Sequence, residues 1–549
     1  MSVETVGDLR DYQDAMIRCF RHDAMEGYAR MYGVLPTGTG KTRVASEIIA
    51  GSLARGRRCL WLVHTRELVW QAAEAITARL DYDSIVGNKT VGIVMASENH
   101  TDADVIVASV QSVRSDRLGT IGPINGVVVV DECHHVTPDN SYGSILARLD
   151  EMSPHLTIGN TATPWRLDKV RLEDVIPRCS FERDIRTMIG EGWLCDLSHR
   201  TISLSSLDLS LAKIVRRLGE HDLADADVAA KVEDREVVQE TVAGTIDHLR
   251  NHPGPALAFC ASVDHAVTLA DCYCRAGITA AAVWGAMDQG ERALTLKRWR
   301  AGDIQLITNC AVLTEGFDFP SITTIIIARP TMSVGLYTQM IGRGTRRAEG
   351  KDGCTILDIT GRLPAKATLV DLSDIVGETL VADDDGYERI SDDDDDHPPQ
   401  GHALRDPYGR SKFMWVEYPD AGYPVWFTPV NGSCHAVLAP NPVSGLYRPW
   451  LVRKDQPEPV PVGDWAPRRQ ALADLEATLA RANVVTRSLA HRDAGWRTEL
   501  PSPKQMGWLR RLDQRTWKRA NDQGWSKGDV SLAIDAALLR EPIQRLMEG

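Results

Sequence analysis

The sequence predicts an α/β protein with two parallel-sheet domains in tandem, followed by a C-terminal accessory domain that is either α+β or mostly helical. Short apolar runs alternate with helical segments early in the chain, for example LWLVH at 60–64 and VVVV at 127–130. The same alternation returns in ALAFC at 256–260 and TTIIIA at 323–328. Such runs are typical of parallel strands whose two faces are both covered by helices. Two separate series therefore predict two sheets.

Domain boundaries follow from length and composition. With 549 residues, the chain has room for about three or four domains. We expect the first sheet domain at 1–180 and the second at 181–370, with a charged helical connecting element at 205–240. Residues 371–400 carry twelve acidic side chains and one arginine, which predicts an acidic linker that does not pack. The accessory domain would then occupy 401–549.

The first motif is the phosphate loop, LPTGTGKT at 35–42. Gly38 and Gly40 allow a tight turn whose N–H groups point inward, and the helix that follows adds its positive N-terminal end. Lys41 would contact the β and γ phosphates of ATP, and the Thr42 hydroxyl would ligate Mg²⁺. Leu35 stands where the general pattern has glycine, so a chance glycine-rich turn is the alternative. The expected nucleotide-binding residues of the loop are Pro36, Thr37, Gly38, Thr39, Gly40, Lys41 and Thr42.

The second motif is VVVVDECHH at 127–135, a buried strand that ends in two carboxylates. Its position predicts that Asp131 and Glu132 lie at the carboxyl edge of the sheet, where such sheets bind ligands. Asp131 would hold Mg²⁺, and Glu132 would orient and deprotonate the attacking water. His134 would sense the γ-phosphate. A solvated strand end is the alternative, which the upstream phosphate loop disfavours.

The DECH box, together with GNTATPWRLD at 159–168, resembles a superfamily 2 helicase of the DEAD/DEAH-like class. The resemblance implies two RecA-like domains, with ATP and Mg²⁺ as cofactors. LRDYQ at 9–13 is similar to the adenine-reading element, in which Arg10 and Gln13 would contact the nucleotide. Thr161 and Thr163 fall on the motif that couples hydrolysis to domain movement.

Further motifs of the resemblance contact nucleic acid. In the first domain, HTRELVWQ at 64–71 and SVQS at 109–112 resemble strand-contacting elements. The residues implied are Thr65, Arg66, Gln111 and Ser112. In TEGFDFP at 314–320 of the second domain, Thr314 would contact the strand, whereas Gly316 and Asp318 would also reach the ribose side of the nucleotide.

QMIGRGTRR at 339–347 resembles the motif that supplies arginine fingers. Gln339, Arg343 and Arg346 would face the phosphates, and such an arginine is worth roughly 10³ to 10⁵ in rate in other phosphate-loop enzymes. The resemblance implies that the arginines reach ATP only when the second domain closes over the first. A solvated basic helix is the alternative.

Within superfamily 2, the sequence most resembles the RadD and UvsW group and the motor subunits of type I and III restriction enzymes. DECH, TATPWR and GKDGCTILDITG at 350–361 carry this resemblance. It implies a DNA helicase or translocase in replication, recombination or repair, of bacterial or phage origin, acting on single-stranded, forked or branched DNA. An RNA helicase or sensor and a double-strand translocase without unwinding remain alternatives. Relatives of the RadD type carry a cysteine cluster after the motor, whereas only Cys434 follows Cys354 here.

A basic segment, PSPKQMGWLRRLDQRTWKR at 501–519, predicts a helix in the accessory domain. Helical spacing would place the following side chains on one face: Lys504, Trp508, Arg511, Arg515 and Lys518. Such a face could bind phosphates, with Arg511 and Arg515 as contacts, and stack on a base. The alternative is a surface helix that packs Leu509, Leu512 and Trp517 inward. This domain could also bind a partner protein.

Charge and terminal sequence indicate a soluble cytoplasmic protein. The net charge of −13 lies mostly in 371–400, so it does not argue against a polyanionic ligand bound in a basic groove. MSVETVGDLR lacks the basic and apolar regions of a signal peptide, and no apolar run is long enough to cross a bilayer. The eleven cysteines are scattered, which fits reduced thiols. We therefore expect no membrane partner.

Overall fold

The computed structural model divides into two compact units, Met1–Tyr387 and Glu388–Gly549. It describes residues 9–82, 86–113, 115–162, 172–217, 220–313, 319–364, 369–372, 375, 413, 415–418, 425–431, 434–453, 456–481, 500–523 and 527–548. Thr163, Thr314, Gly316 and Asp318 lie outside the described residues, as does most of the expected acidic linker at 371–400.

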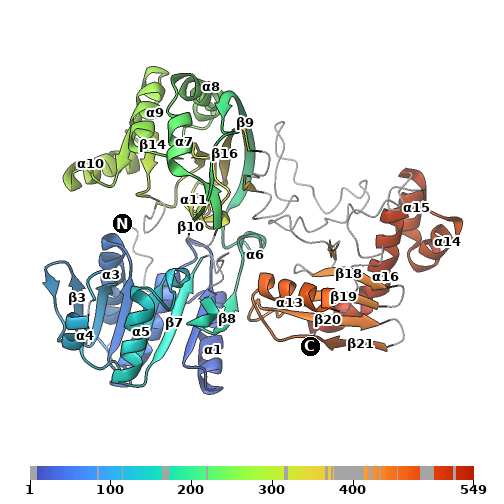
Figure 1. Cartoon of the computed structure of the whole chain (residues 1–549), viewed down its shortest axis with the longest axis horizontal. Coiled ribbons are helices and arrows are strands. Elements are labelled where there is room, and N and C mark those ends of the chain that lie inside the picture. Colours follow the sequence, from blue (N-terminus) through green and yellow to red (C-terminus); the bar gives the residue numbers. More distant parts are fainter. Residues whose placement is uncertain are drawn as a thin grey trace. The chain divides into compact units, whose positions relative to one another are not determined.

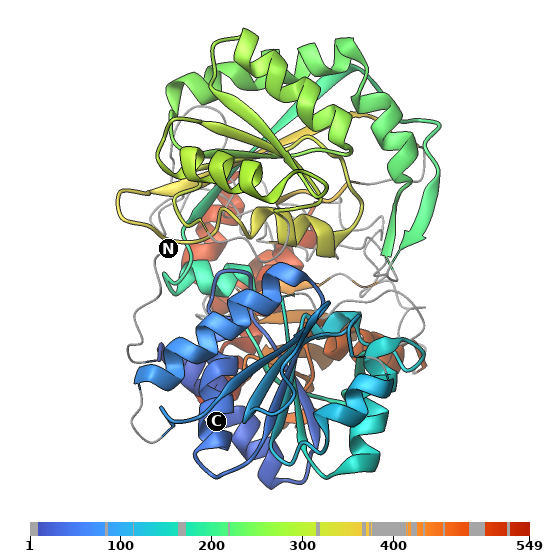
Figure 2. The same cartoon turned by 90° about the vertical axis from the view of Figure 1, so that its left-hand side faces the viewer.

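The first lobe of the larger unit is built on an eight-stranded sheet with helices on both faces (Figure 2). Its strands run in the order β4-β3-β5-β2-β6-β7-β1-β8, all parallel except β4, which pairs antiparallel with β3. The strands are β1 (Arg30–Val34), β2 (Cys59–Val63), β3 (Val91–Met95), β4 (Glu98–Asn99), β5 (Val105–Ser109), β6 (Val127–Asp131), β7 (Leu156–Thr161) and β8 (Arg178–Glu182). The helices are α1 (Asp11–Met25), α2 (Lys41–Leu53), α3 (Arg66–Tyr82), α4 (Ser115–Ile121) and α5 (Ser141–Met152).

The strand order brings the expected catalytic motifs to one edge of this sheet. β7 lies between β6 and β1, with Val34 opposite Thr161 and Asp131 opposite Asn160. Because parallel strands end at the same edge, the phosphate loop after β1 and the carboxylates after β6 come together there. β5 and β2 are also neighbours, so the two strand-contacting motifs of this lobe follow adjacent strands.

The second lobe contains a six-stranded parallel sheet in the order β13-β14-β12-β15-β16-β9 (Figure 1). Its strands are β9 (Asp196–Asp208), β12 (Ala256–Phe259), β13 (Ala280–Trp284), β14 (Leu306–Cys310), β15 (Thr324–Ile327) and β16 (Gly353–Arg362). Its helices are α7 (Asp225–Val232), α8 (Arg235–Asn251), α9 (Val263–Arg275), α10 (Gln289–Arg300) and α11 (Val334–Ile341). A short helix, α6 (Ile185–Gly190), lies between the two lobes in sequence.

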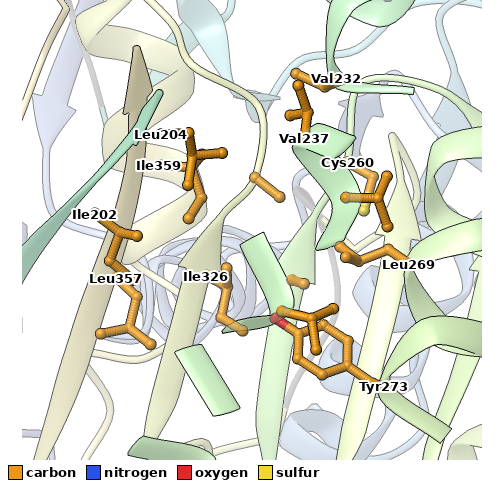
Figure 3. Close-up of a cluster of buried hydrophobic side chains, with 14 of the residues drawn as sticks. Ile202, Leu204, Val232, Val237, Cys260, Leu269, Tyr273, Ile326, Leu357 and Ile359 are labelled. Carbon is orange, nitrogen blue, oxygen red and sulfur yellow. The ribbon is translucent and has the colours of Figure 1, made fainter. Parts of the chain in front are cut away.

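The second sheet buries one face against α8 and α9 (Figure 3). Ile202 of β9, Ile326 of β15 and Leu357 of β16 contribute to this apolar cluster, and Tyr273 of α9 packs into it. The Tyr273 hydroxyl is satisfied by Thr245 Oγ1 at 2.6 Å. Burial of such side chains is the main stabilising contribution to the lobe.

The expected helical connecting element at 205–240 is wrong for its first half. Residues up to Asp208 belong to β9, and β10 (Ile214–Arg217) pairs with β11 (Glu220–Leu223) in a two-stranded hairpin before α7 begins. The sequence contains a strand pattern here, because Leu207 and Leu209 are apolar and buried while Asp208 between them is exposed, which is the two-residue period of a strand. The charged residues that follow masked this alternation.

The smaller unit is α+β. A five-stranded antiparallel sheet, β17-β18-β19-β20-β21, packs α13 on one face and α16 on the other. Its strands are β17 (Val416–Glu417), β18 (Trp426–Asn431), β19 (Cys434–Pro440), β20 (Tyr447–Arg453) and β21 (Gln456–Pro461). Its helices are α13 (Arg468–Arg481), α14 (Pro503–Leu512), α15 (Gln514–Gln523) and α16 (Lys527–Glu548). Trp415 and Trp426 are buried in its core, whereas Trp450 and Trp465 are half-buried with Arg448 between them.

The basic segment at 501–519 is not one continuous helix, so the expected single face is wrong. The chain leaves helical geometry at Asp513, which ends α14, and α15 begins at the next residue. Asp513 accepts hydrogen bonds from Thr516, which favours a new helix start there. Leu509 is fully buried in a small cluster, and Leu512 and Trp517 pack against it. This agrees with the alternative interpretation, in which these three side chains pack inward.

The structure confirms the fold class of two tandem parallel-sheet α/β domains with an additional α+β unit. Across the described part of the chain, no helix combines the length and the apolar character needed to cross a bilayer.

Replacing Ile326 by alanine should destabilise the second lobe by about 2–5 kcal/mol, because the vacated volume in a close-packed cluster cannot fully collapse. Ile326 is 0% exposed. Hydrogen–deuterium exchange of the β12 and β15 amides would measure the loss of stability as faster exchange. Leu211→Ala is the control, because that side chain is 91% exposed and its loss should change exchange little. Equal protection in the two variants would contradict the assignment of this core.

Candidate active site

The phosphate loop (residues 35–42) connects β1 to α2 and depends on two glycines. Gly38 and Gly40 both adopt φ +85°, a left-handed conformation that side chains disfavour, and Gly40 is the N-cap of α2. Within the loop, the Thr39 hydroxyl donates to Pro36 O at 2.7 Å. Lys41 is the first residue of the helix, and its Nζ lies 3.3 Å from Leu35 O. This turn presents its backbone at a helix N-terminus, as an anion site requires.

The LRDYQ segment is fixed against the phosphate loop. Tyr12 Oη donates to Thr39 O at 2.7 Å, and Gln13 Nε2 donates to the same carbonyl at 3.0 Å. Arg10 is the N-cap of α1, and its Nη1 donates to Tyr12 Oη at 3.0 Å. Tyr12 and Gln13 are buried. The sequence indicated Arg10 and Gln13 but missed Tyr12, although it stands between them in the same motif.

A chain of contacts joins the phosphate loop to the DECH box and to β7. Lys41 Nζ is 3.7 Å from Glu132 Oε1, and His134 Nδ1 is 3.3 Å from Glu132 Oε2. The same His134 nitrogen is 2.8 Å from Thr161 Oγ1. Glu132 holds φ +45°, a strained value for a side-chain-bearing residue that is common at functional sites. The structure therefore brings Lys41, Glu132, His134 and Thr161 together.

The two neighbouring carboxylates have opposite pKa shifts. Loss of hydration and then the negative charge of Glu132 raise the pKa of Asp131 to about 6. Loss of hydration would also raise the pKa of Glu132, but the Lys41 ammonium and the His134 imidazole outweigh it and hold that pKa well below its usual range. Glu132 is thus firmly ionised, whereas Asp131 holds its negative charge less readily, and a cation beside Asp131 would favour its ionised form.

The donor set fits ATP and Mg²⁺. Thr42 and Asp131 offer hydroxyl and carboxylate oxygens, the hard ligands that Mg²⁺ prefers. A divalent cation beside Asp131 would offset the charge of Glu132 that raises its pKa. The glycine turn and Lys41 match the shape and charge of a nucleotide's phosphates.

The arginine loop (residues 342–347), which follows α11, lies against the phosphate loop. Thr345 Oγ1 is 3.4 Å from Thr37 O. A Cβ atom built on Gly38 would lie 2.5 Å from Cγ of Arg346, so that side chain crosses the glycine directly. Arg343 is 5% exposed, and Gln339 lies in α11 one helical turn before it. The arginine loop of the second lobe thus contacts the phosphate loop of the first.

The expected strand contacts of the first lobe lie just after β2 and β5. Thr65 Oγ1 accepts a hydrogen bond from Leu68 N at the start of α3, and Arg66 is exposed in the first turn of that helix. Gln111 is exposed, and Ser112 Oγ accepts from Ala96 N at 3.1 Å. Next to Arg66, Glu67 is 3.8 Å from Arg292 of α10, a second contact between the lobes.

Comparison with known proteins identifies the family. The family model described as "Type III restriction enzyme, res subunit" matches residues 7–166, and "Helicase conserved C-terminal domain" matches residues 236–348. The first match spans the phosphate loop and the DECH box, and the second spans the arginine loop. The chain belongs to superfamily 2 of the helicases.

Two relatives of this superfamily 2 helicase are themselves named as helicases. It is 33% identical over 371 residues to a protein named as a mitochondrial ATP-dependent helicase, irc3, of Schizosaccharomyces pombe, covering 66% of this chain and 59% of that one. It is 32% identical over 368 residues to the ATP-dependent helicase IRC3 named in Saccharomyces cerevisiae, covering 64% and 51%. The chain thus spans little more than half the length of these relatives.

One solved structure supports the fold of this superfamily 2 helicase. A fragment named as the HsdR subunit of a type I restriction enzyme from Vibrio vulnificus YJ016 superposes with a TM-score of 0.51 at 21% identity. The likeness covers 68% of this chain and 67% of that fragment.

Replacing Gly38 by alanine should lower nucleotide hydrolysis at least about tenfold, because strain of about 1–2 kcal/mol at positive φ adds to a collision with Arg346. The rate of phosphate release would measure nucleotide hydrolysis. Gly56→Ala is the matched control, since Gly56 has φ +70° but nothing within 4 Å of its added Cβ. Equal hydrolysis by the two variants would mean that the contact with Arg346 has no role in turnover.

Proposed function

We propose that this chain is an ATP-dependent DNA helicase or translocase that couples ATP hydrolysis to movement on DNA or to its unwinding. The contact between the arginine loop and the phosphate loop carries the proposal, because it places residues of both lobes at one nucleotide site. Hydrolysis at such a site depends on lobe closure, and lobe closure can move a bound strand.

ATP would bind with its phosphates over residues 36–42, and Arg10 and Gln13 would read the adenine. Thr42 and Asp131 would hold Mg²⁺, whose chemistry at this site would be to neutralise phosphate charge. Lys41 would contact the γ-phosphate, and its 3.7 Å distance to Glu132 keeps that carboxylate next to the reacting phosphate. The contacts of Lys41 with Glu132 and of Gln13 with Thr39 O support these roles.

Glu132 would orient the attacking water and accept its proton. His134 contacts both Glu132 and Thr161, so a change at the γ-phosphate can reach β7 through two short contacts. Thr161 directly precedes the segment that contains Thr163, which extends the proposed coupling motif. His134 would therefore act as the relay between hydrolysis and the strand-binding surface.

Arg343 and Arg346 would neutralise the charge that develops in the transition state, with Gln339 beside them. The low exposure of Arg343 favours this role, because a guanidinium acts more strongly where water is excluded. Opening of the lobes would withdraw both arginines and stop hydrolysis. One ATP would then be used per cycle of closing and opening.

DNA is the proposed polymer. A relative named as the DNA 3'-5' translocase XPB2 of Sulfurisphaera tokodaii is 34% identical over 162 residues, which cover 29% of this chain and 32% of that one. The β-strands β2 and β5 are neighbours, and the expected contact residues follow them: Thr65, Arg66, Gln111 and Ser112. These residues would therefore contact successive phosphates of one DNA strand. Thr314, Gly316 and Asp318 would extend this track in the second lobe, the latter two also reaching the nucleotide. In the smaller unit, the exposed Arg511 and Arg515 would add phosphate contacts or bind a partner protein.

ATP hydrolysis should rise strongly with single-stranded or forked DNA and less with matched RNA, because strand binding favours the closed lobes. Phosphate release across single-stranded, duplex, forked and RNA substrates would measure it. Lys41→Ala should abolish turnover, whereas Glu132→Gln should stop turnover yet retain ATP and strand. Stronger stimulation by RNA would favour an RNA helicase, and triplex displacement without strand separation would favour a double-strand translocase. Wild-type turnover in Glu132→Gln would rule out the proposed base.

Arg343→Ala should reduce kcat by roughly 10³ or more while ATP affinity changes little, because the finger acts on transition-state charge. Single-turnover hydrolysis and ATP binding would separate the two effects. Arg148→Ala is the matched control, since that arginine is 63% exposed on α5 in the first lobe. Normal turnover in the Arg343 variant would remove its proposed role.

A further inference from the structure

Trp193 lies in the segment between the lobes, after β8 of the first sheet and before β9 of the second. The end of α6 fixes its backbone: Gly192 adopts φ +74°, and Trp193 N donates to Met188 O at 2.9 Å. The indole is half-buried. It carried no motif signal in the sequence, because its neighbours in space are distant along the chain.

The Trp193 indole contacts the LRDYQ segment at residues 9–13, which would read the base of the nucleotide. Its ring meets Tyr12 edge-to-face, with centroids 5.1 Å apart and planes at 69°. The Arg10 guanidinium carbon lies 5.8 Å from the Trp193 ring centroid. Both geometries are attractive, the first through ring quadrupoles and the second through a cation over a π face. Since Tyr12 also hydrogen-bonds Thr39 O, the indole is one side chain away from the phosphate loop.

The backbone on either side of Trp193 is fastened to the arginine loop. Cys195 N donates to Thr345 O at 2.8 Å, and its Sγ donates to Gly344 O at 3.2 Å. On the other side, Arg347 Nη1 donates to Gly192 O at 2.5 Å. One short segment therefore contacts the LRDYQ segment through the Trp193 side chain, and the arginine loop through its backbone and the Cys195 thiol.

We propose that Trp193 is a positioning residue that transmits occupation of the base end of the nucleotide site to the arginine loop. The inference deepens the proposed function and rests on it. A base bound against Arg10 and Gln13 holds the Arg10–Tyr12 pair in place, and this pair in turn sets the indole. The indole sets the backbone at 192–195, which holds residues 344–347 over the phosphate loop. Nucleotide without correct base contacts would then be bound by its phosphates but hydrolysed slowly.

Trp193→Ala should lower kcat for ATP about tenfold and raise KM about threefold, because both ends of the link are loosened. Trp193→Phe keeps a ring for Tyr12 and Arg10, and should stay within about threefold of wild type. Arg347→Ala removes the contact to Gly192 O and keeps the Trp193 ring contacts, so it should lower kcat with KM unchanged. Steady-state hydrolysis of ATP with saturating single-stranded DNA would measure all three, and thermal unfolding would verify that each variant is folded.

The double variant Trp193→Ala/Arg347→Ala distinguishes coupling from two unrelated defects. If both residues act through one link, its kcat should be no lower than that of the worse single variant, whereas independent sites would multiply their effects. ADP binding should also quench tryptophan fluorescence less in Trp193→Phe than in wild type. Multiplicative effects, or unchanged kcat and KM in a folded Trp193→Ala, would overturn the proposal.

Failure of the proposed function would look different. Lys41→Ala would then retain hydrolysis, or the wild-type chain would show none. Loss of hydrolysis in Lys41→Ala together with a fully active Trp193→Ala would reject only the role of Trp193.

Discussion

The arrangement of the larger unit depends on a close approach of two backbones, those of the phosphate loop and the arginine loop. Thr345 reaches Thr37 O, and Gly342 approaches Thr37 so closely that an added Cβ would lie 2.8 Å from its Cβ. Gly38 likewise has no room for a side chain under Arg346. Glycines on both sides of the contact are therefore a steric requirement of closure, in addition to the tight turn that phosphate binding needs.

The proposed coupling would use two sets of contacts, a short route and a long one. The short route stays in the first lobe, where Lys41, Glu132, His134 and Thr161 are joined by contacts of 2.8 to 3.7 Å. It depends on the adjacency of β1, β6 and β7, which the sheet order fixes. The long route passes through the segment between the lobes, where backbone hydrogen bonds tie residues 192–195 to the second lobe.

Sequence reasoning placed the motifs correctly where they are contiguous in sequence. The phosphate loop and the DECH box are strings of adjacent residues at a strand end, so their place at the sheet edge follows from the pattern. It failed where local charge hid a weaker period, as in β9 and the β10–β11 hairpin. It also failed at Asp513, where a local hydrogen bond to Thr516 outweighs helical propensity and separates Arg511 from Arg515. Tyr12 and Trp193 meet only in the folded chain, and no spacing rule could have paired them.

The character of the contacts between the lobes explains how a nucleotide can control them. Each lobe holds a large apolar core, whereas polar contacts join the two lobes, such as Thr345 with Thr37 and Glu67 with Arg292 at 3.8 Å. Polar contacts of this kind are worth only about 1 kcal/mol each or less. A closed state held so weakly can be shifted by the charge-assisted bonds that a triphosphate would make with Lys41, Arg343 and Arg346. An apolar interface of the same extent would hold the lobes closed whether or not nucleotide was bound, and the cycle of closing and opening would be lost.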